Sequence, residues 1–336
     1  MRITRDTLLK IAKEAIDRQV RTNREIVAAY LCGSLLGDDF LLGGTADIDL
    51  VFVHDGQPPS LREIIHLTDE VHLDIAHHDQ NEYRQPRSLR AHPWLGPTLN
   101  SCKALYDPRH FLDFTLASVR SQFDRPDTVL QRVRGSAERS RQIWTRRQML
   151  PAVPGPQEFN SYLRAIWHVA NAIAGLNGPP LTERRFLLGF PARAAALNRP
   201  GLYAGLLGLL GAPNISTHTL WGWLAMWQTA CHALPSENIP PRLHPHRSAY
   251  YQKAFEALLG NPQPQAVLWP LLHTWSLAAN LLPPQSDEVH DWHEALVQAG
   301  LLGPNFSERL EALDAYLDLG DETLEEWALA NGAGEA

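Results

Sequence analysis

Two aspartates that are one residue apart, Asp47 and Asp49, begin a hydrophobic run that extends to Val53. Side chains alternate between the two faces of a β-strand. These carboxylates are therefore expected on one face, ~6.5–7 Å apart along the chain, with Ile48 and Leu50 pointing into the sheet packing. Hard divalent cations prefer such oxygen ligands, and paired cations sit ~3.5–4 Å apart in two-metal sites. The pattern predicts a site for a pair of divalent cations.

A third acid, Asp74, lies within a second hydrophobic run, residues 71–76. An aspartate in an apolar, strand-forming run is unfavourable unless it has a partner or a task. Three acids on two neighbouring strands therefore indicate a metal cradle made of Asp47, Asp49 and Asp74. The alternative is that they are ordinary exposed residues of strands or turns.

Small residues flank the first acidic pair. Gly33 and Ser34 follow a predicted strand, where a tight turn would offer backbone N–H groups and a hydroxyl to a phosphate. Gly43 and Gly44 would let the chain approach the same place closely, and Thr45 follows them directly. Gly33, Ser34 and Thr45 are accordingly predicted to bind the phosphates of a nucleotide.

The order and spacing of these residues resemble the polymerase-β-like nucleotidyltransferase superfamily. Its pattern is Gly-Ser, a gap of about a dozen residues, an Asp-hydrophobic-Asp strand and a later acid, here Gly33, Ser34, Asp47, Asp49 and Asp74. The resemblance implies that Asp47 and Asp49 hold Mg²⁺ on a nucleoside triphosphate and that Ser34 contacts a phosphate. Asp74 would either complete the second metal site or take the proton of the acceptor hydroxyl. That hydroxyl would attack the α-phosphorus, with pyrophosphate leaving.

A narrower likeness lies further along the chain. Residues 162–168 and 181–188 are similar to the helical domain of aminoglycoside adenylyltransferases of the streptomycin/spectinomycin type. This likeness implies transfer of AMP from ATP to a hydroxyl of a small molecule, with an aminoglycoside antibiotic as the first candidate and Arg185 as a nucleotide-binding residue. The chain is longer than such enzymes, so its acceptor can differ. Other arginines fit a phosphate equally well: Arg84, Arg87, Arg90 and Arg184.

Two other functions stay open on the sequence alone. One is the AMPylation of a protein side chain, an activity found within the same superfamily. The other is a non-catalytic nucleotide-sensing or antitoxin module, against which the intact set of three acids argues. The sequence does not indicate an oligomeric state.

Hydrophobic periodicity predicts the elements that would position these residues. One helical face contains Leu8, Ala12 and Ile16, and four short strand signals follow at residues 26–31, 50–53, 71–76 and 104–106. Residues 60–69 are predicted to form a short helix. Beyond residue 110 the pattern is helical, and nine of the ten tryptophans follow residue 143. We therefore expect an α+β protein: an α/β nucleotidyltransferase domain with a small mixed sheet (1–112), then an all-helical substrate-binding domain (113–336).

Charge and composition narrow the class further. The chain has 336 residues, with 30 lysines and arginines against 37 acids and a formal charge of −7. That balance argues against a bulk nucleic-acid binder, so the expected partners are a nucleoside triphosphate and a small acceptor. Three widely spaced cysteines make neither a disulfide framework nor a zinc site. No run approaches the ~18 apolar residues of a membrane span, and we expect a cytoplasmic protein.

Overall fold

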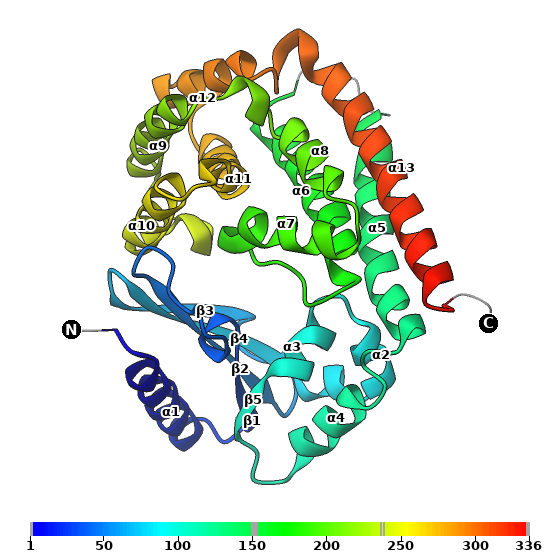
Figure 1. The fold of residues 1–336 in the computed structure, drawn as a ribbon. Coiled ribbons are helices and arrows are strands. Elements are labelled where there is room, and N and C mark those ends of the chain that lie inside the picture. The colour runs from blue at the N-terminus through cyan, green and yellow to red at the C-terminus, as the bar shows by residue number, and fades with distance from the viewer. Residues whose placement is uncertain (1–2, 149–153, 236, 238, 334–336) are drawn as a thin grey trace. The chain divides into compact units, whose positions relative to one another are not determined.

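The computed structural model describes residues 3–148, 154–235, 237 and 239–333. The chain forms two compact units, Met1–Thr128 and Val129–Ala336 (Figure 1). The first unit contains a sheet with its helices, and the regular elements described in the second unit are all helical. The expected α+β class is confirmed. No helix in the described ranges has both the length and the apolar character needed to cross a membrane.

One mixed sheet organises the first unit. Its strands, in the order β3-β4-β2-β1-β5, include a single parallel pair, β2 with β4, and the remaining neighbours are antiparallel. The strands are β1 (Ile26–Cys32), β2 (Ala46–His54), β3 (Arg62–Thr68), β4 (Val71–Asp79) and β5 (Lys103–Tyr106).

Helices cover both faces of this sheet. Helix α1 (Arg5–Thr22) packs Leu8, Ala12 and Ile16 on the face that also receives Ile48 and Leu50 of β2. The opposite face carries Val51 and Val53 and packs against α2 (Pro86–Ala91), α3 (Leu95–Ser101) and α4 (Phe111–Arg120). Because strand side chains alternate, Asp47 and Asp49 share the face of Val51 and Val53.

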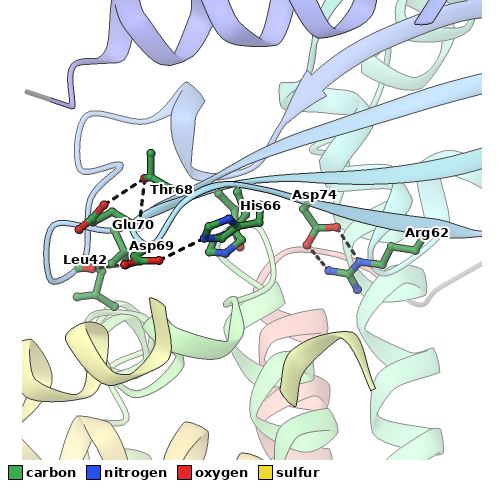
Figure 2. Close-up of polar contacts among 10 residues, drawn as sticks. Leu42, Arg62, His66, Thr68, Asp69, Glu70 and Asp74 are labelled. Atoms are coloured by element: carbon green, nitrogen blue, oxygen red, sulfur yellow. Dashed lines mark hydrogen bonds and ion pairs between the residues drawn. The ribbon is translucent and has the colours of Figure 1, made fainter. Parts of the chain in front are cut away.

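The prediction of a helix over residues 60–69 is wrong, because this segment forms β3 and pairs antiparallel with β4. Leu61, Ile64 and Ile65 stand at helical spacing, yet the free edge of β4 is completed by a hairpin at the turn Asp69-Glu70. Side chains stabilise that turn: the Glu70 N–H donates to Thr68 Oγ1 at 3.3 Å (Figure 2). Backbone pairing with β4 therefore overrides the local helical pattern.

The first unit extends past residue 112, where the sequence placed the end of the catalytic domain. Leu112, Leu116 and Val119 of α4 are buried in the same hydrophobic cluster as Tyr30 of β1. Helix α4 is therefore part of the core of the first unit, and the division between units falls between Thr128 and Val129.

The second unit is a helical assembly with an aromatic core. Tryptophans pack in pairs: the partly exposed Trp167 stacks on the buried Trp269 with ring centroids 4.4 Å apart, and the buried Trp223 meets the buried Trp275 edge-on at 6.1 Å. Its helices are α5 (Pro126–Gln148, which starts in the first unit), α6 (Pro156–Gly175), α7 (Phe186–Ala196), α8 (Gly201–Leu209), α9 (Thr217–His232), α10 (Ser248–Leu259), α11 (Leu268–Ala279), α12 (Asp287–Gln298) and α13 (Phe306–Ala330).

The acidic last helix is tied to its neighbours by arginines. Arg141 of α5 donates to Asp314 at 2.7 Å and to Asp318 and Asp321 at 2.8 Å, and these acids recur on one face of α13. Arg199, which follows α7, pairs with Glu322 and Glu326 of the same helix. Five acids of α13 are therefore engaged within the second unit.

A buried histidine makes this unit sensitive to acid. His273 of α11 is 8% exposed and stacks on Trp269, with ring centroids 4.7 Å apart. Its Nδ1 lies 3.2 Å from Asn160 Oδ1, so the neutral ring donates a hydrogen bond there. Burial lowers the pKa of His273 to about 4, with a smaller opposing effect from Glu183 and further lowering from Arg242 and Arg164.

We predict that His273→Gln reduces the acid sensitivity of the second unit. Between pH 6.5 and about 4 the unfolded chain binds a proton at this histidine that the folded chain does not, so the unfolding free energy falls as the pH drops. A pKa near 4 makes this contribution about 3 kcal/mol across that window. Urea unfolding followed by tryptophan fluorescence at pH 7, 5.5 and 4 measures it.

The exposed His218 provides the matched control, since His218→Gln makes the same exchange at the surface. The wild type and His218→Gln should lose stability in parallel, with His273→Gln losing about 3 kcal/mol less between pH 7 and pH 4. Three parallel curves would contradict the assignment.

Candidate functional site

Three carboxylates meet on one face of the sheet. The parallel pairing of β2 and β4 places Asp49 opposite Asp74 and Asp47 opposite His72. One oxygen from each of Asp47, Asp49 and Asp74 lies within 4.8 Å of the other two. Asp47 and Asp74 are buried, at 8% and 6% exposed, and Asp49 is partly exposed. The structure thus brings together the three acids that the sequence singled out.

This concentration of negative charge requires compensation. Two carboxylates at such a distance repel by roughly 3–4 kcal/mol at an effective dielectric constant of 20. Arg62 of β3 supplies one positive charge: its Nε donates to Asp74 Oδ1 at 2.7 Å and its Nη2 donates to Asp74 Oδ2. Figure 2 shows this two-pronged contact, in which the guanidinium faces the carboxylate edge-on. His72 of β4 lies beside a second carboxylate, with its Nδ1 3.9 Å from Asp47 Oδ1.

The glycine of the Gly-Ser pair is required by close contact with the site. Gly33 has φ +76° and ψ −161°, a conformation that is essentially restricted to glycine. A Cβ at this position would overlap the carboxylate of Asp49. Ser34 follows, partly exposed, at the start of the 3-10 turn η1 (Ser34–Leu36). The first strand therefore ends with its backbone against Asp49.

Thr45 has a structural task in the turn that leads into β2. Its hydroxyl donates to the carbonyl of Leu42 at 2.7 Å, and the two residues also exchange backbone hydrogen bonds. Between them, Gly43 and Gly44 have positive φ angles of 61° and 74°. Thr45 is fully buried, so its side chain stabilises the turn before Asp47 from the protein interior.

Arg185 belongs to the second unit, unlike the other predicted site residues. It ends the 3-10 turn η3 (Glu183–Arg185) and directly precedes α7. Its role as a phosphate partner stays a prediction.

Sequence reasoning missed two neighbours of the carboxylates. Arg62 was hidden by the false helix over residues 60–69; as a strand residue on the face of Asp74 it would have been a natural partner. Cys32 lies opposite Asp49 in the register of β1 and β2, and its Sγ donates to the Asp49 carbonyl at 3.7 Å. Burial, reinforced by Asp49, raises the pKa of the Cys32 thiol, which therefore stays neutral.

The three carboxylates suit a hard divalent cation. Mg²⁺ binds oxygen at ~2.0–2.1 Å, so ligands on opposite sides of one ion lie ~4.2 Å apart. The 4.8 Å limit on the separations of the aspartate oxygens is close to that span. Within the described ranges this is the one set of at least three acids, histidines or cysteines that meets such a spacing. The chemistry of the donors and their burial both fit the cation that the sequence predicts.

Neither a family model nor a curated protein matches the chain. Among solved structures, it is similar to a nucleotidyltransferase-like protein from Exiguobacterium sibiricum 255-15. The two chains share 9% sequence identity and a TM-score of 0.31, over 94% of this chain and 91% of the other. At this low similarity the comparison assigns no activity to this chain. The resemblance to the superfamily depends on the residues of the site alone.

We predict that Gly33→Ala disrupts the site, because the added methyl group must displace the Asp49 carboxylate and force the backbone out of a glycine conformation. Mn²⁺ affinity, measured by electron paramagnetic resonance of the free ion, should fall at least tenfold.

Gly44→Ala is the matched control. Gly44 also has a positive φ, 74°, but no atom lies within 4 Å of a Cβ built there. Its substitution should cost about 1–2 kcal/mol of stability and leave Mn²⁺ affinity unchanged. Equal losses of Mn²⁺ affinity in both variants would show that backbone strain, rather than contact with Asp49, explains the effect.

Proposed function

We propose that this protein is an Mg²⁺-dependent nucleotidyltransferase that moves AMP from ATP to a hydroxyl of a small molecule. The observation that supports the proposal is the meeting of Asp47, Asp49 and Asp74 beside the glycine-specific turn at Gly33. A set of acids and a glycine turn in this order is the pattern by which the sequence resembles the superfamily. The three free cysteines are in keeping with a cytoplasmic enzyme.

In this proposal Asp47 and Asp49 hold the cation, and the turn at Gly33 and Ser34 contacts a phosphate of the nucleotide, with Arg185 as a further phosphate partner. Bound Mg²⁺ supplies charge neutralisation on the triphosphate. The acceptor oxygen forms a bond to the α-phosphorus as the bond to pyrophosphate breaks. Asp74, once Arg62 has left it, receives the hydroxyl proton, or it completes a second metal site and the proton passes to solvent. Positioning and electrostatic stabilisation provide the rate enhancement.

An aminoglycoside is the first candidate for the acceptor, on the likeness of residues 162–168 and 181–188 to the helical domain of the adenylyltransferases. The acidic helix α13 offers limited attraction for a cationic acceptor, because Arg141 and Arg199 engage five of its carboxylates. A protein side chain is the rival acceptor.

We predict that Asp47→Asn and Asp49→Asn each lower transfer at least about a hundredfold, since each variant removes a charge that the metal requires. The assay follows α-labelled ATP with Mg²⁺ against a panel of aminoglycosides and, separately, against proteins. Asp55→Asn serves as the control, because Asp55 is an exposed acid just beyond β2.

Retention of transfer by Asp47→Asn or Asp49→Asn would refute the metal assignment. Label on proteins alone would move the acceptor to a side chain. Nucleotide binding without transfer to any acceptor would favour a sensing module.

A further inference from the structure

The ion pair between Arg62 and Asp74 bears on how many cations the site holds. The guanidinium engages both carboxylate oxygens of Asp74, the geometry of the strongest arginine–carboxylate contacts. The two partners differ in freedom: the Asp74 side chain is 7% exposed and the Arg62 side chain is 49% exposed. Arg62 can therefore leave into solvent, whereas Asp74 is fixed in the sheet.

The ion pair with Arg62 distinguishes Asp74 from Asp47 and Asp49. The side chains of Asp47, Asp49, Asp74 and Arg62 together have a formal charge of −2, and His72 Nδ1 lies 3.9 Å from Asp47 Oδ1. One divalent cation balances that charge. A second divalent cation would bring a net positive charge to the site and would compete with the guanidinium for the same two oxygens of Asp74.

We propose that Arg62 occupies the place of the second cation, so that the nucleotide-free protein binds one divalent ion through Asp47 and Asp49. A second ion gains Asp74 only when Arg62 leaves. This inference rests on the metal site of the proposed function, and it makes Arg62 a positioning residue that controls the occupancy of the site.

The register of the sheet allows Arg62 to leave Asp74 without a movement of the strands. Arg62 stands opposite Ala76, and Ile64 stands opposite Asp74. The arginine of β3 therefore reaches diagonally to Asp74 on the adjacent strand β4. Because the contact is made by a long side chain and not by a shift of the strand, a change of rotamer breaks it. The hairpin of β3 and β4 can stay paired throughout.

Titration of the full-length chain with Mn²⁺ in the absence of nucleotide tests the proposal. Free Mn²⁺ is counted by electron paramagnetic resonance. The wild type should bind one ion per chain. Arg62→Gln should bind two, with the second at least tenfold tighter than any second ion on the wild type. Arg62→Lys should fall between them, because an ammonium keeps the charge without the two-pronged geometry.

Two controls assign the effect to this ion pair. Arg125→Gln removes the same charge from an exposed pair with Asp127 in the same unit and should behave as the wild type. Adding Asp74→Asn to Arg62→Gln should remove the second ion. A second ion that survives in the double variant, or one that appears in Arg125→Gln, would overturn the proposal.

The outcomes separate this inference from the function on which it rests. One ion in both the wild type and Arg62→Gln, with equal affinity, overturns the role of Arg62 and leaves the metal site standing. Two ions of similar affinity on the wild type would also overturn the role of Arg62 and leave the metal site standing. No ion on either chain overturns the metal site itself, and with it both proposals.

Discussion

Repulsion among three carboxylates is the constraint around which the first unit is built. Each pair of the acids Asp47, Asp49 and Asp74 has oxygens within 4.8 Å, and two of the three side chains are almost fully buried. Such a cluster is stable only if other parts of the fold hold it in place and supply positive charge. The parallel pairing of β2 and β4 does the first, since the backbone hydrogen bonds of the sheet fix the separation of Asp49 and Asp74. The guanidinium of Arg62 does part of the second.

The remaining parts of the site follow from the same crowding. Gly33 is a glycine because the chain must turn where the Asp49 carboxylate already fills the space of a side chain. Thr45 ties the turn before β2, so that Asp47 enters the sheet in register. On the other face of the sheet, α1 packs on Ile48 and Leu50, which fixes the alternation that turns the acids the opposite way. Strand β2 thus packs apolar side chains against α1 on one face and presents Asp47 and Asp49 on the other.

The acids could be found from the sequence because their signal is local. Alternation in one strand places Asp47 and Asp49 on a common face, and an aspartate in an apolar run draws attention to Asp74 wherever the strand lies. Arg62 could not be found in this way. Its role depends on β3 completing the edge of β4, a pairing between segments that the helical spacing of Leu61, Ile64 and Ile65 conceals. The end of the first unit was obscured for a similar reason, since α4 reads as one more helix until its contacts with Tyr30 are known.

The position of β3 at the edge of the sheet affects how readily its backbone hydrogen bonds open. An edge strand has a neighbour on one side only, and five of the seven residues of β3 are exposed. Such strands open at a lower free energy than central ones, and their amide hydrogens exchange sooner. The arginine that meets Asp74 is therefore carried by the part of the sheet whose protection is easiest to perturb. Deuterium uptake along β3, compared with that of the central strand β2, would show how much more readily this edge of the sheet opens.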